Sequence, residues 1–393
     1  MRIKIERLVH RGLGLGKFSG KTIFVPGVIP GEIAECEIET EKASYAVGRM
    51  TKLIQPSPFR TQPACRHFPA CGGCQLMHID YQHQLDLKTQ VLVETIRRIA
   101  KLDPSPLLKE PAPAPSALRY RSRVRFHISA GEIGFKPFQA RGFVRIDDCL
   151  LARDELRAAI PALRKLVREI NLGKDYEVEL DVEPETKKVF ALISARRKDF
   201  YILENQAFVK AKLLPKELLR LLSFVQVNPE QNKKMVELAA GLAESVQAKT
   251  ALELFPGSGN FSFAIAEKVN RLVAVEFNRN AVELANIKKR ERKADNIEFI
   301  SQAADSYLNY AVKSRLQFDL VVLDPPRTGA KKEVERMVRI PPDSIVYVSC
   351  EPATLARDLK ILAAAGYRIE KIIPIDMFPQ TFHLETITLL HKT

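Results

Sequence analysis

The sequence contains no tryptophan and only six cysteines among its 393 residues. Six cysteines are too few for a disulfide scaffold, and a chain of this length can bury two or three cores without one. No apolar run approaches the ~20 residues of a membrane-spanning helix, and Met1 to Arg7 lack the apolar segment of a secretory leader. We therefore expect a cytoplasmic globular protein with no membrane partner and no obligate protein partner.

Acidic residues are outnumbered, since 61 lysines and arginines stand against 47 aspartates and glutamates, a formal net charge of +14. Such a surplus favours a polyanionic partner such as RNA, DNA or an acidic membrane, and a merely basic protein is the alternative. Arg119, Arg121, Arg123 and Arg125 alternate along the chain, so on a strand they would share one face that could hold phosphates. A solvated strand face is the alternative. Phe224 is an aromatic candidate for stacking on a base.

Three regions follow one another along the chain. Residues 1–58 contain short strand patterns separated by glycine and proline turns, which is typical of a small OB-like β-barrel. Residues 59–225 hold three clustered cysteines, a helix at about 81–101, a proline-rich connector and an α+β stretch. Residues 226–393 show seven strand patterns, the first six separated by helices, which predicts a doubly wound parallel sheet. The last two strands are joined too closely for a parallel crossover and should pair antiparallel.

A glycine turn follows the first strand of the third region. Gly257 and Gly259 would let the backbone approach a ligand, but Ser262 replaces the third glycine of a dinucleotide motif. No phosphate-binding lysine follows the turn. Glu276 ends the next strand, where a carboxylate can accept both ribose hydroxyls. The combination favours S-adenosylmethionine over NAD, with a ligand-free β–α turn as the alternative.

Two later strands end in reactive residues, Asp324 of Asp-Pro-Pro and Cys350 of Ser-Cys-Glu-Pro. The carboxyl ends of parallel strands meet at one edge of a sheet, and the final antiparallel strand begins there with Glu385. Thiol, carboxylate and methyl donor together suit methylation of uracil C5, in which a thiolate adds at C6 and a base later removes the C5 proton. Cys350 is thus the predicted nucleophile and Glu385 the predicted base. Taken singly, each could be a buried thiol or a solvated carboxylate.

Cys65, Cys71 and Cys74 lie within ten residues of one another. In a chain without an export signal, such a group favours metal binding over disulfides. Only the second pair has the spacing of a zinc knuckle, so the spacing leaves zinc and an iron–sulfur cluster equally open. Cys36 lies in a predicted barrel strand and should be buried and inert.

These motifs resemble those of the RNA 5-methyluridine methyltransferases, specifically the iron–sulfur branch that acts on 23S ribosomal RNA. The resemblance covers nearly the whole chain. It implies a TRAM barrel at 1–58, a central iron–sulfur and RNA-binding domain at 59–225, and a Rossmann-like methyltransferase domain at 226–393. The segments that carry it are Cys65-x5-Cys71-Gly72-Gly73-Cys74, Phe224-Val225-Gln226-Val227-Asn228, Ser349-Cys350 with Pro352 to Asp358, and Met377 to Glu385.

The resemblance also implies two bound groups. A [4Fe–4S] cluster would be held by Cys65, Cys71, Cys74 and, at a distance in the chain, Cys149. S-adenosylmethionine would contact Gln226, Phe255, Gly257, Gly259, Asn260, Glu276, Asp305 and Asp324.

The sequence departs from the family pattern in two places. Glu351 follows the nucleophile where the family usually has Asn, and Asp305 belongs to a loose version of the adenine-contacting stretch. Within the family, methylation of the tRNA T-loop is an alternative to 23S rRNA. Outside it stand a non-catalytic, cluster-bearing RNA-binding or ribosome assembly factor, and an amino-methyltransferase that uses Asp-Pro-Pro without a thiol. The presence of Cys350, Asp324 and Glu385 argues against the non-catalytic factor. The amino-methyltransferase would need no nucleophile, so Cys350→Ala should leave it active.

Overall fold

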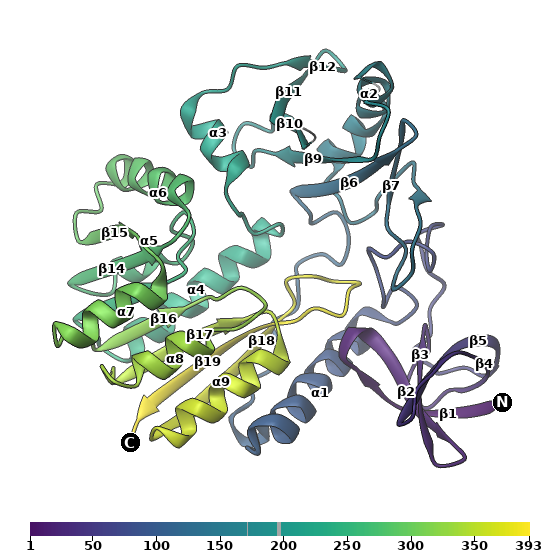
Figure 1. Cartoon of the computed structure of the whole chain (residues 1–393), viewed down its shortest axis with the longest axis horizontal. Coiled ribbons are helices and arrows are strands. Elements are labelled where there is room, and N and C mark those ends of the chain that lie inside the picture. The colour runs from purple at the N-terminus through teal and green to yellow at the C-terminus, as the bar shows by residue number, and fades with distance from the viewer. Residues whose placement is uncertain (171, 195–197) are drawn as a thin grey trace. The chain divides into compact units, whose positions relative to one another are not determined.

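The structure, a computed structural model, describes residues 1–170, 172–194 and 198–393 (Figure 1). The chain divides into two compact units and passes between them several times. The first unit contains Met1–Val91, Pro115–Ala211 and Phe378–His383, and the second contains Leu92–Ala114, Lys212–Met377 and Leu384–Thr393. Within the described residues, no helix has both the length and the apolar character needed to span a membrane.

Five strands near the N-terminus form a closed barrel in the order β1-β2-β3-β5-β4, as the sequence predicted for this region. Cys36 is buried in its interior. The strand β2 was not predicted, because its glycines were interpreted as turns. At Gly14 a Cβ would lie 2.3 Å from the Val28 side chain, and at Gly16 one would lie 2.4 Å from that of Ile3. The glycines are therefore required by close packing inside the barrel. The strands are β1 (Arg2–Val9), β2 (Leu13–Phe18), β3 (Lys21–Pro26), β4 (Ile33–Glu41) and β5 (Tyr45–Gln55), with the short helix η1 (His10–Gly12) after β1.

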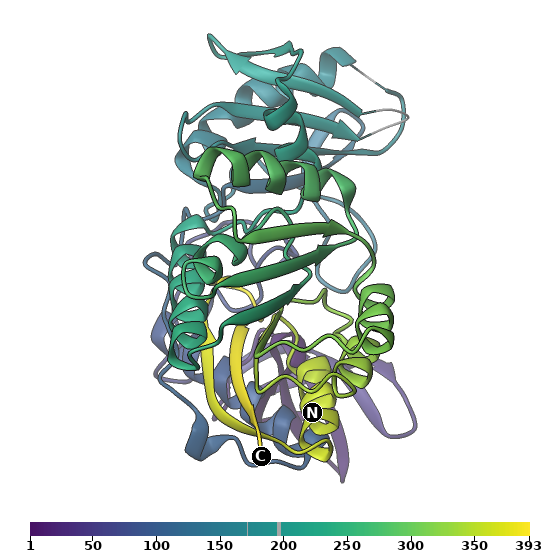
Figure 2. The same cartoon turned by 90° about the vertical axis from the view of Figure 1, so that its left-hand side faces the viewer.

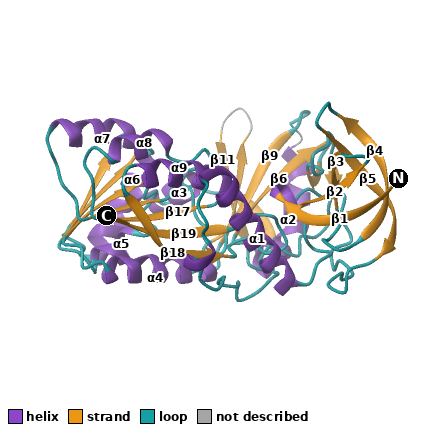
Figure 3. Ribbon diagram, turned by 90° about the horizontal axis from the view of Figure 1, so that it is seen from below, coloured by secondary structure: helices purple, strands orange, loops and turns teal. Residues whose placement is uncertain are grey.

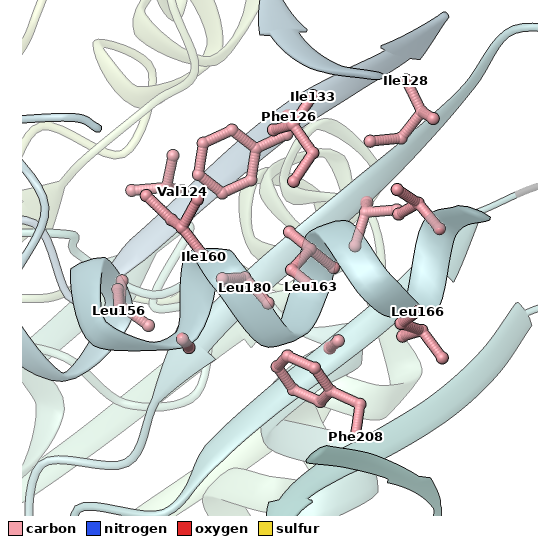
Figure 4. Packing of buried hydrophobic residues seen from close by; sticks show 14 of the residues in the cluster. Val124, Phe126, Ile128, Ile133, Leu156, Ile160, Leu163, Leu166, Leu180 and Phe208 are labelled. Atoms are coloured by element: carbon pink, nitrogen blue, oxygen red, sulfur yellow. The ribbon is translucent and has the colours of Figure 1, made fainter. Parts of the chain in front are cut away.

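The first unit also contains a seven-stranded sheet whose strands are all paired antiparallel, in the order β12-β11-β10-β9-β6-β7-β8. The helix α2 covers it, since Leu156, Ile160 and Leu163 recur at helical spacing and pack against Phe126 and Leu180 (Figure 4). The elements are β6 (Arg123–Ser129), β7 (Glu132–Phe135), β8 (Val144–Arg145), α2 (Asp154–Ile170), β9 (Tyr176–Val182), β10 (Val189–Ser194), β11 (Lys198–Glu204) and β12 (Ala207–Lys210).

The helix α1 (Tyr81–Ala100) matches its predicted position and begins in the first unit. There it holds the segment 378–383, which directly precedes the predicted base. Gln84 exchanges hydrogen bonds with Gln380, whose backbone N–H donates to the Gln84 amide oxygen at 3.1 Å. Lys88 donates to the Phe378 carbonyl at 3.1 Å. The two ends of the base motif, Met377 and Glu385, therefore belong to the second unit, and its middle, 378–383, belongs to the first.

The second unit is built on a seven-stranded sheet in the order β15-β14-β13-β16-β17-β19-β18 (Figures 1 and 2). The strands stand where the sequence predicted them, and β19 runs antiparallel to both β17 and β18. Figure 3 shows α7 and α8 on one face of the sheet and α4 and α5 on the other. The elements are β13 (Thr250–Leu254), β14 (Arg271–Glu276), β15 (Ile297–Ser301), β16 (Leu320–Leu323), β17 (Ser344–Ser349), β18 (Tyr367–Ile375), β19 (Glu385–Lys392), α3 (Pro215–Leu222), α4 (Pro229–Ser245), α5 (Ser262–Ala266), α6 (Arg279–Arg292), α7 (Ala304–Lys313), α8 (Lys331–Met337) and α9 (Pro352–Ala364).

The proline-rich connector belongs to this unit. After the short helix η2 (Ser105–Leu107), Leu108 and Ala112 form parallel bridges to Ile372 and Ile375 of β18. The Lys109 N–H donates to the Ile372 carbonyl at 2.8 Å. The connector thus covers the outer edge of β18, whose backbone groups would otherwise be unpaired.

Candidate active site

The glycine turn joins β13 to α5 at the carboxyl edge of the second unit's sheet. Gly257 and Gly259 have φ values of +56° and +85°, which favour glycine, and a Cβ at Gly259 would lie 2.6 Å from the Phe263 ring. Glu276, at the end of β14, holds the turn. One of its carboxylate oxygens accepts the Gly257 N–H at 3.1 Å, and the other accepts the Asn278 N–H at 2.8 Å. The predicted ribose-binding carboxylate therefore lies directly against the predicted cofactor turn.

The start of α4 lies beside this turn. Asn228 caps the helix by accepting the Gln231 N–H at 3.3 Å. One turn later, Asn232 exchanges two amide hydrogen bonds with Asn260, of 2.8 and 3.1 Å. The side-chain oxygen of Gln226 is buried and accepts no hydrogen bond from the described residues. A buried acceptor without a partner costs free energy, so Gln226 is suited to contact a ligand.

The predicted nucleophile and base are neighbours across two antiparallel strands. The last registered pair of β17 and β19 is Ser349 and Thr386. The next residues outward are Cys350 and Glu385. Asp324 directly follows β16, the parallel neighbour of β17 on its other side. The fold thus brings these three residues to one sheet edge from separate parts of the chain.

The electrostatics of this edge favour protonated groups at rest. Burial and the Glu385 carboxylate raise the pKa of the Cys350 thiol from an ordinary 9.0 to about 12, Asp324 adds to the rise, and Arg327 opposes it. Burial and the Asp324 charge likewise raise the pKa of Glu385, again against Arg327. Burial raises the pKa of Asp324. Without RNA the nucleophile is therefore a thiol beside two carboxyl groups of increased basicity.

Two residues of this site were missed by the sequence analysis. Arg327 is exposed, and its position three residues after Asp324 was the available sign. Glu253 is fully buried in β13, accepts a 2.5 Å hydrogen bond from the Ser262 hydroxyl, and has a pKa raised to about 8 by burial. The charges of Asp324 and Glu276 add to that rise. A glutamate inside an apolar strand pattern was the sign for Glu253.

The two departures from the family pattern have structural consequences. Glu351 is the N-cap of α9, and its carboxylate accepts the Ala353 N–H at 3.3 Å, which is the capping role that Asn also serves. Glu351 is not among the causes of the raised Cys350 pKa. Asp305, in the first turn of α7, forms an ion pair with Arg336 of α8. A ligand bound by Asp305 would therefore compete with that guanidinium.

The four predicted metal-binding cysteines lie together in the first unit. They line one cavity of about 220 Å³, and none forms a disulfide. Burial raises the pKa of Cys71 to about 11 and of Cys74 to about 12, and the neighbouring thiols add to both rises. Among the described residues, no group of three or more His, Cys, Asp or Glu side chains forms a site for a single metal ion.

The prediction of one arginine face on a strand is wrong for its first two members. The strand β6 begins only at Arg123, and Arg119 precedes it with a φ of +57°. Arg121 lines the cysteine cavity, and its guanidinium donates a hydrogen bond to the Tyr120 hydroxyl at 3.4 Å. Burial opposes its charge, but Tyr120 and the thiols of Cys149 and Cys74 outweigh burial and raise the pKa of Arg121. A buried cation therefore faces the thiols rather than an RNA backbone.

The other two arginines lie on β6 but carry carboxylate partners. Arg123 is paired with Asp181, which is 1% exposed, and with Glu179 at 3.4 Å. Arg125 is paired with Glu179 at 2.9 Å and is largely exposed. Only Arg125 of this pair is placed to meet phosphate. Phe224 is 71% exposed, as a base-stacking residue requires, and its role stays a prediction.

Comparisons with known proteins agree with the geometry. The family described as tRNA (Uracil-5-)-methyltransferase matches residues 193–393, and the TRAM domain matches residues 1–51. The 23S rRNA (uracil(1939)-C(5))-methyltransferase RlmD of Vibrio parahaemolyticus is 31% identical, over all of this chain and 96% of that protein. RlmD of Pectobacterium atrosepticum is 33% identical, over all of this chain and 94% of its own length. The crystal structure of Pyrococcus abyssi tRNA (uracil-54, C5)-methyltransferase with S-adenosyl-L-homocysteine has a TM-score of 0.73 at 26% identity, and covers 99% of this chain and 100% of that one.

Proposed function

Because the chain belongs to the RNA uracil-C5 methyltransferase family, we propose that it methylates a uridine of 23S rRNA through a covalent adduct on Cys350. Its reaction class is S-adenosylmethionine-dependent methylation of uracil C5 in RNA. The observation that carries the mechanism is the adjacency of Cys350 and Glu385 across β17 and β19, at the carboxyl edge where the glycine turn also lies. A thiol and a base at that edge are the two groups that this chemistry needs.

In the proposed steps the Cys350 thiol loses its proton to solvent, and the thiolate forms a bond to uracil C6 while the ring electrons move toward C5 and O4 to give an enolate. The enolate carbon C5 would then form a bond to the methyl group that bound S-adenosylmethionine supplies, and the methyl–sulfur bond would break to leave S-adenosylhomocysteine. Glu385 then accepts the C5 proton, and the electrons of the broken C–H bond expel the thiolate from C6. The thiol returns to its starting state, so no electron donor is required.

The resting charges suit these steps. With a pKa of about 12, Cys350 is almost entirely protonated near neutral pH, which protects it from alkylation by its own cofactor. The raised pKa of Glu385 makes it a stronger base than an ordinary glutamate. Arg327 lowers the pKa of both groups. We therefore assign Arg327 to stabilising the thiolate as it forms.

We assign the binding of S-adenosylmethionine to the glycine turn and the residues around it. Gly257 and Gly259 would pass the backbone close to the ligand, and Glu276 would accept the ribose hydroxyls with the lone pairs that its two backbone donors leave free. Gln226 and Asn260 would contact the methionine portion. Phe255, Asp305 and Asp324 complete the proposed set.

The choice of 23S rRNA rests on the relatives. The two RlmD proteins match the chain end to end at 31% and 33% identity, whereas the tRNA enzyme of Pyrococcus abyssi is 26% identical. The test is methyl transfer to matched transcripts of 23S rRNA fragments and of tRNA, with the modified position mapped by mass spectrometry. We expect product only on the rRNA. Methylation confined to the tRNA T-loop would replace this substrate with the alternative.

For the cysteine cavity we propose a [4Fe–4S] cluster held by Cys65, Cys71, Cys74 and Cys149. The four thiols that line one cavity and the positive charge of Arg121 beside them support it, because a cluster with four thiolates is anionic. Protein purified without oxygen should be brown and carry about four irons per chain. Stoichiometric zinc and a colourless protein would contradict the proposal without touching the methylation chemistry.

Replacement of the nucleophile tests the mechanism. Cys350→Ala should abolish both methyl transfer and the RNA adduct that survives denaturing electrophoresis. The matched control is Cys36→Ala, a thiol buried in the barrel, which should keep both. An active Cys350→Ala enzyme would exclude covalent catalysis and favour an amino-methyltransferase.

A further inference from the structure

One lysine of α6 differs from its neighbours in what it contacts. Lys288 belongs to a basic run that would ordinarily form a solvated helix face, and Lys289 and Arg290 follow it. Its ammonium instead donates to the Ser258 carbonyl at 3.1 Å and to the Ser258 hydroxyl at 2.9 Å. Ser258 is 8% exposed and lies between the two glycines of the cofactor turn. A half-buried amine thus donates two hydrogen bonds to the central residue of the turn.

The turn is held at two successive residues. Glu276 accepts the Gly257 N–H, and Lys288 donates to the Ser258 carbonyl. Both flanking glycines have positive φ, a conformational freedom that costs entropy when the turn is ordered. The Gly259 and Asn260 N–H groups donate to the Pro256 carbonyl at 3.0 and 3.2 Å and close the turn. The contacts of Glu276 and Lys288 restrain the peptides on either side of the Gly257–Ser258 bond. Arg292 of α6 adds support, since its guanidinium lies 4.7 Å from the centre of the Phe263 ring that packs against Gly259.

The charges around Lys288 oppose its protonation. Arg292 on the same helix and Lys216 and Arg220 on α3, which packs against α6, are cations that lower the pKa of Lys288, and Glu291 opposes them. Glu291 is itself engaged by Lys216 at 2.8 Å. Burial and these cations lower the pKa of Lys288 to about 8, so its ammonium loses the proton within an accessible pH range.

We propose that Lys288 is a positioning residue that fixes the Ser258 peptide of the cofactor turn and thereby sets the affinity for S-adenosylmethionine. The inference rests on the proposed assignment of the glycine turn to the cofactor. Protonated Lys288 is the stronger donor to the carbonyl. Because the ammonium holds the turn best, the affinity for the cofactor is greatest at low pH and falls as Lys288 loses its proton.

The test measures binding of S-adenosyl-L-homocysteine to the whole protein by calorimetry between pH 6.5 and 9.5. Lys288→Met should raise Kd about tenfold at pH 7, which corresponds to ~1.4 kcal/mol, and leave kcat at saturating cofactor within twofold. Lys288→Arg should restore the affinity and remove the fall above pH 8, because the guanidinium stays charged. Ser258→Ala removes only the hydroxyl acceptor and should weaken binding less.

Lys289→Met is the matched control, because this neighbouring amine donates to the Ile297 carbonyl and not to the turn. It reports the background pH dependence of the ligand's own amino group. A Lys288→Met protein with unchanged Kd and the wild-type pH profile would overturn the proposal. If Lys288→Met does not fold, a wild-type profile in Lys288→Arg overturns it equally. Glu276→Gln separates the role of Lys288 from the assignment of the glycine turn to the cofactor. Unchanged affinity in Glu276→Gln would refute that assignment.

Discussion

Replacing Glu385 with glutamine should lower the pKa of Cys350, the proposed nucleophile, as well as remove the proposed base. The rise of the Cys350 pKa from 9.0 to about 12 corresponds to about 4 kcal/mol. Burial is its largest cause and the Glu385 charge the next. We therefore assign about 1.4 kcal/mol, a tenfold effect, to that charge. Glu385→Gln keeps the shape and removes the charge, so the pKa of Cys350 should fall by about 1.

The assay is the rate of alkylation of Cys350 by iodoacetamide at pH 9, followed by peptide mass spectrometry without RNA. At that pH most Glu385 is ionised in the wild type, and thiolate remains a minority, so the rate scales with the thiolate fraction. We expect Glu385→Gln to react about tenfold faster. With RNA and cofactor the same variant should accumulate the methylated adduct, because a lost general base typically costs ~10²–10⁴-fold.

Two results would refute this reasoning. Alkylation that is unchanged or slower in Glu385→Gln would mean that the carboxylate does not act on the thiol. Normal turnover by the variant would mean that another group removes the C5 proton, and Asp324 would be the first candidate, since its charge also acts on Cys350.

Two further predictions concern the support of the site and the arginines. Tyr347 donates to Asp358 at 2.7 Å and both side chains are 0% exposed, so Tyr347→Phe should lower the free energy of urea unfolding of the second unit by about 2 kcal/mol; a loss under 0.5 kcal/mol, measured by circular dichroism, would contradict it. Arg123→Gln removes the guanidinium that is paired with the buried Asp181 carboxylate, so it should cost about 3–5 kcal/mol of stability. The salt dependence of RNA binding should stay unchanged in that variant, whereas a reduced slope in folded protein would return Arg123 to phosphate binding.

Much of the reactive edge could be predicted because its chemistry sits at the ends of strands. Strand patterns bounded by Gly and Pro fixed the positions of Asp324, Cys350 and Glu385, and topology alone then placed them together. The N-cap at Asn228 was equally local, since one side chain and the following proline define it. The roles of these residues in catalysis and cofactor binding stay predictions.

Other features escaped because they depend on what lies across the fold. The barrel strand β2 contains glycines that a sequence pattern interprets as turns, although the packing of Val28 and Ile3 requires them. The alternation of arginines suggested one strand face, yet the chain enters β6 only at Arg123, so Arg121 turns toward the cysteines. The alternation of residue types along the chain does not show at which residue a strand begins to pair with its neighbour.

The order of apolar, glycine and reactive residues along the chain therefore determined which strands form and which chemical groups stand at their ends, because those choices depend on near neighbours. Tertiary structure alone decided the charges and contacts those groups experience: the burial that raises the pKa of Cys350, the thiols that surround Arg121, and the peptide that Lys288 holds. The physical reason is that desolvation and Coulomb interaction depend on distance in space, which separation along the chain does not specify.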